Sequence, residues 1–231
     1  MKIAIMQPYF FPYIGYFQLI AEADTFVVYD NIQYTKKGWI NRNRILQNGK
    51  GVLFTIPLKK ASDYLDVCER ELSGDFNRKK LLNQITGAYR RAPYFKQTFP
   101  LIEQIVQFED PNLFSYLHYS IFSICKYLGI KTEIKTSSDI DIDHKLKGQD
   151  KVLAICETLG ADSYVNAIGG VELYSKDIFK AKGIDLNFIR SKPIEYPQFG
   201  AEFAPMLSMI DTMMFNSLEI IQKQITQYDL V

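Results

Sequence analysis

A basic and aromatic stretch between residues 30 and 44 has the side chains best suited to bind an anion. Arg42 offers a planar guanidinium that can bind a phosphate or carboxylate through two hydrogen bonds, and Lys37 offers a point charge. We predict that these two cations neutralise charge that develops during a reaction. We predict substrate contacts for four neighbours, of which the tryptophan would stack on a ring: Tyr34, Trp39, Asn41 and Asn43. A solvated basic hairpin is the alternative.

A second candidate site follows the first apolar run of the chain. Here Tyr13 and Tyr16 stand where the nucleotidyltransferase signature, a strand followed by His-x-Gly-His and a helix, has its histidines. Gly15 would let the backbone approach a phosphate at the helix N-terminus, where free amides favour an anion. Tyrosine hydroxyls donate hydrogen bonds to phosphate but stay neutral at pH 7. We predict that this loop binds substrate through Gln7, Tyr9, Tyr13, Gly15 and Tyr16, with simple packing of the tyrosines as the alternative.

A diglycine supplies a third candidate. Asn166, Gly169 and Gly170 come just after a short strand pattern, and a diglycine exposes backbone amides that can cradle an anionic group. Gly-Gly is also an ordinary tight turn. We predict substrate-binding roles for these three residues because their strand would end at the same sheet edge as the opening loop.

Few side chains can act as an acid or base near neutral pH. The chain has two histidines, of which His118 fits helix packing and His144 is the acid/base candidate. Asp211 is a second candidate, with capping of the last helix as the alternative. We predict a substrate contact for Gln198, in the polar set before it. Residues 139–150 imitate a calcium loop, but His144 stands where that loop needs glycine. We therefore predict no protein metal site, although a nucleotide such as ATP could bring Mg²⁺.

Alternating strand and helix patterns must position these residues. The first three elements predict a β-α-β unit, which places the opening loop at the ligand-binding edge of a sheet. We predict one α/β domain over residues 1–231, a Rossmann-like, open and mostly parallel sheet resembling the nucleotidyltransferases, with a helical insertion at about 75–130. The expected strands are 2–6, 25–29, 52–58, 132–136, 163–165 and 184–189; the expected helices are 13–23, 76–91, 94–108, 111–128, 149–159, 176–182 and 216–227; residues 30–50 are expected to be irregular.

Composition excludes several classes of protein. Hydrophobic residues make up 47% and charged residues 23% of the 231 residues, which is typical of a folded globular chain. The formal net charge of +1 gives no bulk electrostatic reason for a nucleic-acid or membrane-surface partner. Three widely spaced cysteines form no disulfide framework, and no signal or membrane-spanning pattern is present. We therefore expect a cytoplasmic protein that acts on small molecules.

The motifs taken together resemble one known family. They are Gln7-Pro8-Tyr9 with Gly15-Tyr16, Trp39-Ile40-Asn41-Arg42-Asn43, Tyr164-Val165-Asn166 with Gly169-Gly170, Tyr196-Pro197-Gln198-Phe199, and Leu207-Ser208 with Asp211 and Asn216. In this order they resemble the WbqC-like family over nearly the whole chain. That family is associated with bacterial O-antigen and surface-polysaccharide gene clusters, and glycine transfer has been suggested for a member. The resemblance implies glycyl or other acyl transfer to an amino sugar and assigns no catalytic residue.

These observations give three hypotheses about function. The first is a transferase that forms an amide on a nucleotide-linked amino sugar, with ATP activating the acyl donor. In that scheme Lys37 and Arg42 neutralise developing charge, and His144 or Asp211 takes the proton from the attacking amine. The second is a non-catalytic protein of polysaccharide assembly that binds a sugar nucleotide. The third is an acyltransferase that draws on a thioester or aminoacyl-tRNA donor.

Overall fold

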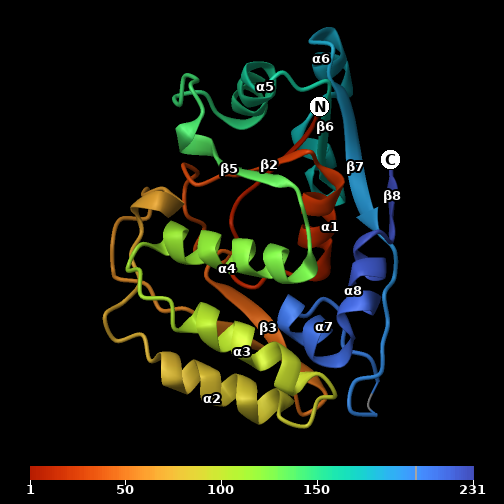
Figure 1. The fold of residues 1–231 in the computed structure, drawn as a ribbon. Helices are drawn as coiled ribbons and strands as arrows, with labels where there is room; N and C mark the ends of the chain where they lie inside the picture. Colours follow the sequence, from red (N-terminus) through yellow and green to blue (C-terminus); the bar gives the residue numbers. More distant parts are fainter. Residues whose placement is uncertain (201) are drawn as a thin grey trace.

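A six-stranded sheet forms the centre of the molecule (Figure 1). The computed structural model describes residues 1–200 and 202–231. Five strands are parallel, and the last pairs antiparallel with its neighbour. In spatial order they are β5 (Glu133–Thr136), β2 (Thr25–Val28), β1 (Lys2–Met6), β6 (Ser163–Ala167), β7 (Asp185–Ser191) and β8 (Tyr228–Leu230). The prediction of a Rossmann-like, open and mostly parallel α/β sheet is confirmed.

The opening β-α-β unit forms as expected. Helix α1 (Ile14–Glu22) connects β1 to β2, which pair in parallel from Ile3 opposite Thr25 onward. On its other side β1 pairs with β6, so the strand order reverses at β1: β2 and β5 lie on one side of it, and β6 and β7 lie on the other. Such a reversal leaves a crevice at the carboxyl ends of the two strands, where open α/β sheets bind ligands. The fold therefore places the loops after β1 and β6 together.

Apolar side chains cover both faces of the sheet. On one face, Phe26 of β2 packs in a cluster with Phe17 of α1 and Leu117 of α4 (Leu113–Leu128). On the other face, Ile3 and Ile5 pack with the helix α5 (Gly148–Thr158) and with Phe179 of α6 (Lys176–Ala181). Burial on both faces explains why the strands read as continuous apolar runs rather than as alternating patterns.

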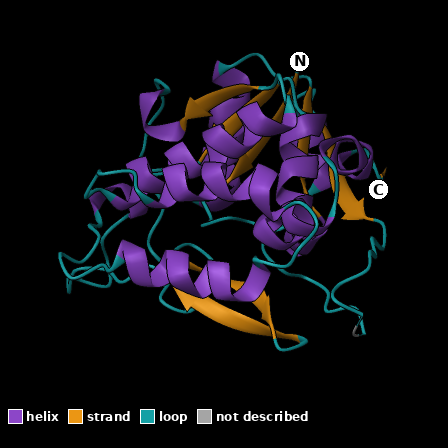
Figure 2. Cartoon of the chain, turned by 60° about the horizontal axis from the view of Figure 1, so that its bottom comes forward, coloured by secondary structure: helices purple, strands orange, loops and turns teal. Residues whose placement is uncertain are grey.

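The segment between residues 40 and 130 builds a second layer. The predicted helices are present as α2 (Arg78–Tyr89), α3 (Phe95–Val106) and α4. Strands β3 (Arg42–Gln47) and β4 (Lys50–Thr55) form a separate antiparallel hairpin, where residues 30–50 were expected to be irregular. The hairpin turns at Asn48-Gly49, a dipeptide typical of two-residue hairpin loops. Both residues have positive φ, 52° and 72°, as such a loop requires. Figure 2 shows helices between this hairpin and the main sheet.

The C-terminal region also differs from expectation. The helix expected over 216–227 is present as α8 (Leu218–Ile225), and the structure adds α7 (Met209–Phe215) before it and β8 after it. Ser217 separates α8 from α7, because its side chain accepts a hydrogen bond from the amide of Ile220 and caps the start of α8. Short 3₁₀ helices complete the described elements: η1 (Val67–Glu69), η2 (Ser137–Asp139) and η3 (Ile168–Leu173). Within residues 1–200 and 202–231, no helix is both long and apolar enough to cross a membrane.

Candidate functional site

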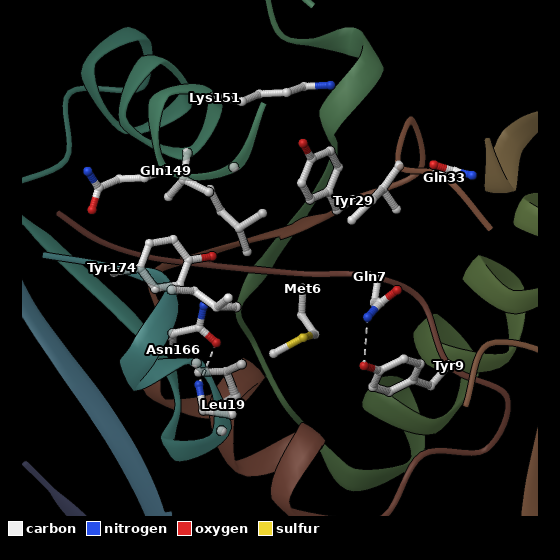
Figure 3. A pocket seen from close by; sticks show the side chains of 18 of the residues that line it. Met6, Gln7, Tyr9, Leu19, Tyr29, Gln33, Gln149, Lys151, Asn166 and Tyr174 are labelled. Carbon is white, nitrogen blue, oxygen red and sulfur yellow. Dashed lines mark hydrogen bonds between the residues drawn. The ribbon is translucent and has the colours of Figure 1, made fainter. Parts of the chain in front are cut away.

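A cavity of about 990 Å³ opens at the carboxyl ends of β1, β2 and β6 (Figure 3). Met6 and Gln7 line it where β1 ends, Asn166 where β6 ends, and Gln149 and Lys151 at the start of α5. Its position is the crevice that the strand order creates. A volume of this size suits a ligand as large as a nucleotide-linked sugar.

Ten of the residues singled out from the sequence line this one cavity, although they come from four separate stretches of the chain. They are Gln7, Tyr9, Tyr13, Gly15, Tyr16, Trp39, His144, Asn166, Gly169 and Gly170. Their convergence follows from the parallel strands, whose carboxyl ends meet at one edge.

The loop after β1 forms a wall of neutral hydrogen-bonding groups. Gln7 donates through Nε2 to the hydroxyl of Tyr9 at 2.9 Å, and the hydroxyl of Tyr16 donates to the carbonyl of Gln7 at 3.1 Å. Burial raises the pKa of the Tyr9 and Tyr16 hydroxyls, so both stay protonated. This wall can position a polar ring but carries no charge of its own.

Gly15 does not have the role that the nucleotidyltransferase frame implied. A Cβ placed on Gly15 would lie 2.5 Å from the ring of Tyr13, so this tyrosine covers the backbone where a phosphate was expected to approach. A side chain at position 15 would collide with the ring of Tyr13, which explains the glycine. By contrast, nothing lies within 4 Å of a Cβ placed on Gly169, whose backbone is open.

Asn166 fixes the loop after β6. Its Nδ2 donates to the hydroxyl of Tyr164 at 2.7 Å, and its Oδ1 accepts from the amide of Ala167 at 2.6 Å. A Cβ on Gly170 would lie 3.3 Å from the Cγ of Asn166, so the diglycine packs closely over this side chain. Asn166 is buried and holds the turn that forms the cavity wall.

Three residues of the stretch 30–44 that were predicted to contact substrate lie outside the cavity lining and form hydrogen bonds within the protein instead. They are Tyr34, Asn41 and Asn43. Asn41 accepts from the hydroxyl of Tyr34 at 2.8 Å and donates to the carbonyl of Ile56. Asn43 donates to the carbonyls of Phe10 and Phe11, at 3.1 and 2.8 Å. All three side chains are buried. The two asparagines donate hydrogen bonds to backbone carbonyls that would otherwise lack a partner in the interior.

The two cations predicted to neutralise charge also lie outside the lining. Arg42 donates from Nε to the carbonyl of Gly38 at 2.9 Å and from Nη2 to the carbonyl of Lys37. The guanidinium thus closes the turn before β3, and the side chain of Lys37 is exposed. Trp39, between them in sequence, does line the cavity and has the guanidinium of Arg44 5.1 Å from its ring centre.

Asp211 and Gln198 form a buried network away from the cavity. The Asp211 carboxylate accepts from the hydroxyl of Tyr89 at 2.8 Å, the hydroxyl of Tyr196 at 2.9 Å and Nε2 of Gln198 at 2.6 Å. Asp211 is fully buried, and burial raises its pKa. It lies in the first turn of α7, where the side chain of Ser208 caps the helix, so Asp211 caps neither this helix nor the last one.

The charged centre of the cavity is Lys151, which sequence reasoning missed. Only 2% of its surface is exposed. Its Nζ donates to two oxygens of Asn31, the side-chain Oδ1 at 3.0 Å and the carbonyl at 3.3 Å. Within the described residues it has no carboxylate partner within ion-pair distance, and burial lowers its pKa. Lys151 is the fourth residue of an amphipathic helix, where its sequence context is the same as that of a solvated lysine, so no sequence pattern indicates its burial.

The lysine also fixes the orientation of Asn31 and, through it, of His144. An ammonium group has no lone pair, so the Asn31 atom 3.0 Å from Nζ must be the oxygen. The amide nitrogen of Asn31 therefore points to Nδ1 of His144, at 2.9 Å. Because that nitrogen donates, Nδ1 of His144 must accept, and the proton of the neutral ring lies on Nε2.

A carboxylate shares the cavity with the lysine. Asp66, at the start of η1, lines the wall, and its pKa is raised, mainly by burial and also by the nearby charge of Glu69, while Lys151 and Lys147 oppose the shift. Tyr29 lies beside the lysine, with Nζ of Lys151 4.9 Å from its ring centre. Burial raises the pKa of Tyr29 to about 12, so its hydroxyl is neutral. The cavity lining thus contains two lysines, Lys151 and Lys147, and one carboxylate, Asp66.

Among residues 1–200 and 202–231, no three His, Cys, Asp or Glu side chains gather closely enough to hold a metal ion.

Comparison with known proteins places the chain in a family. A protein of Mycobacterium tuberculosis, uncharacterized protein Rv1507c, is 29% identical over 219 residues, which is 93% of each chain. No solved structure matches the chain. The sequence profile of the WbqC-like protein family matches residues 7–223, which include every residue of the candidate site from Gln7 to Gly170. The chain therefore belongs to the WbqC-like protein family.

Proposed function

We propose that the protein transfers an acyl group, glycyl first among the candidates, to the amine of a nucleotide-linked amino sugar in O-antigen or surface-polysaccharide synthesis. The observation that carries this proposal is the pairing of Lys151 and Asp66 in one cavity. An amino-sugar nucleotide has the complementary charges, phosphate on one part and an amine on another. The family name supports the polysaccharide setting, and we propose a cytoplasmic location because nucleotide-linked sugars are made there.

The neutral walls would hold the uncharged parts of such a ligand. Trp39 offers a stacking face, while Gln7 and Tyr9 offer hydrogen bonds to sugar or base. Gly169 leaves its backbone open beside them. Specificity would then come from these polar groups and affinity from the apolar surface around them.

The proposed reaction forms one bond and breaks one. The amine nitrogen attacks the carbonyl carbon of the activated acyl donor, and the bond from that carbon to its leaving group breaks. With glycine as donor, ATP first forms glycyl-adenylate and releases pyrophosphate, and AMP leaves in the transfer step. The amine proton passes to the Asp66 carboxylate, which replaces Asp211 and His144 in the base role because Asp66 is the carboxylic residue that lines the cavity.

Mass spectrometry tests the proposal directly. Purified protein is incubated with ATP, Mg²⁺, glycine and a nucleotide-linked amino sugar, and the sugar nucleotide is expected to gain one glycyl group. Asp66→Asn should reduce the rate about 100-fold, within the range for loss of a general base. Lys145→Met, an exposed change in the loop before α5 that does not line the cavity, is the control.

A second function remains as the alternative. The protein would bind a sugar nucleotide for polysaccharide assembly without altering it, and the same cavity favours this reading because most of its polar groups are neutral. Saturable binding with intact ligand, and no product from glycine, acyl-CoA or aminoacyl-tRNA donors, would establish this alternative and reject the transferase.

A further inference from the structure

We propose that Lys151, His144 and the start of α5 form a subsite for a phosphate or diphosphate group, with Asn31 holding both side chains in place. The inference rests on the proposed function for its biological ligand, since a nucleotide-linked sugar carries a diphosphate. The subsite itself is argued from the side chains alone.

The first support is a buried cation without a counter-ion. Lys151 makes its hydrogen bonds to the neutral oxygens of Asn31, and its third N–H has no partner among the described residues. A buried ammonium that lacks an anion is unfavourable, and a bound anion would relieve that cost. Asp66 and Asp30 lie near enough to influence Lys151, but neither reaches ion-pair distance.

The second support is the proton on His144. Because Asn31 donates to Nδ1, the neutral ring offers an N–H at Nε2 and has no free lone pair. His144 therefore selects a ligand atom that only accepts, such as a phosphate oxygen. With Nδ1 accepting from Asn31, Nε2–H is the hydrogen-bonding group that His144 offers to a ligand.

The helix adds a further contribution. Leu146, Lys147, Gly148 and Gln149, at the N-terminus of α5, all line the same cavity, and no side chain caps this end of the helix. Uncapped amides and the positive end of the helix dipole favour an anion. Lys147 adds an exposed positive charge beside them.

Asn31 is thus a positioning residue whose amide orientation joins the two donors. Ser137 Oγ also lies 2.7 Å from Oδ1 of Asn31 and the same distance from Oδ1 of Asp30, which anchors the amide from behind. Replacing Asn31 by Asp removes the donor to His144. A carboxylate can only accept, so the ring proton must move from Nε2 to Nδ1.

Nitrogen-15 NMR of the histidine rings tests this arrangement without any substrate. The chain has two histidines, so the spectrum of His118→Gln identifies the signals of His144. We expect the Nε2–H form in the wild type and the Nδ1–H form in Asn31→Asp. An Nδ1–H ring in the wild type would overturn the proposed orientation.

Titration calorimetry with inorganic pyrophosphate tests the subsite itself. Lys151→Gln keeps a donor for Asn31 but loses the charge, and should weaken binding at least about tenfold, the effect of losing one charged hydrogen bond. Lys145→Met should change the affinity less than about twofold. Equal affinity in wild type and Lys151→Gln would reject the subsite. Pyrophosphate binding that depends on Lys151, together with no amide product, would instead retain the subsite and reject the transferase.

Discussion

At the scale of single residues, burial and geometry decide which titratable group can act. His144 and Asp211 are the acid/base candidates of the sequence, but Nδ1 of His144 is occupied by Asn31 and Asp211 is enclosed by three donors. Asp66, by contrast, lines the cavity. Nothing in the sequence around Asp66 distinguishes it from other aspartates, because its role depends on Lys151, 85 positions later.

The pH dependence of the reaction should report Asp66. Its pKa is raised above the ordinary carboxyl value of 3.8, chiefly by burial. The amine can lose its proton only to the ionised form, so kcat/KM should fall on the acid side as pH drops through this raised pKa. In Asp66→Asn this acid limb should disappear from the pH–rate profile. An unchanged limb in the variant would assign the titration to another group.

Asp211 should matter for stability instead. Asp211→Ala leaves the hydroxyls of Tyr89 and Tyr196 and the amide of Gln198 without their acceptor in a buried site. We expect the free energy of unfolding to fall by about 3 kcal/mol or more, because each unsatisfied donor carries its own desolvation cost. Urea unfolding measures the change, and Glu103→Gln, an exposed change on α3, is the control. A loss below about 1 kcal/mol would contradict the network's role.

The same carboxyl should make stability depend on pH. Because burial raises the pKa of Asp211, the folded protein binds this proton more tightly than the unfolded chain. Its contribution is therefore fully present below the unfolded value and is lost as pH rises through the folded pKa. The urea series should show this decline between about pH 4 and the raised pKa, and Asp211→Asn should remove it.

At the scale of elements, the opening loop is shaped by partners from outside the main sheet. Phe11 has a φ of 42°, which is rare for a bulky residue, and its carbonyl accepts from Asn43 of the hairpin and from Ser208 before α7. These donors fix the backbone between Gln7 and Tyr13. The hairpin therefore supports the cavity wall, although none of its strand residues lines the cavity.

Removing one donor should loosen the loop. In Asn43→Ala the carbonyls of Phe10 and Phe11 lose a shared donor, so we expect a loss of about 1–2 kcal/mol in unfolding free energy and faster hydrogen exchange at residues 9–12. Binding of a sugar nucleotide should weaken as the loop loses its fixed shape. Exchange unchanged at residues 9–12 would mean that Ser208 alone sets the loop.

Sequence patterns predicted the regular elements better than the contacts between them. The strand 2–6 and the helix 111–128 follow from local apolar spacing and caps, and both form. The strand Arg42–Gln47 was not predicted, because its buried polar residue Asn43 bonds to the backbone of the opening loop. A contact of this kind leaves no periodic pattern of apolar residues in the sequence. For the site, parallel strands made the position of Gln7 and Asn166 predictable, whereas Lys151 and Asp66 depend on tertiary packing.

At the scale of the whole molecule, most of the candidate site residues lie at one edge of the sheet. A native-state ligand there should raise overall stability by mass action, by about 2.7 kcal/mol at a hundredfold excess over Kd. We expect an amino-sugar nucleotide to raise Tm in a thermal-shift series and glycine alone to leave it unchanged. Lys151→Gln should lose most of the shift. A shift of equal size in this variant would place the ligand elsewhere.

The single tryptophan has a practical consequence for every such measurement. Trp39 lines the cavity, is 40% exposed and has a guanidinium beside its ring. Light that excites tryptophan selectively will thus report from the mouth of the site and from nowhere else in the chain. Occupancy can be followed by the protein's own fluorescence, in stopped flow as well as at equilibrium, with no dye attached and no residue replaced.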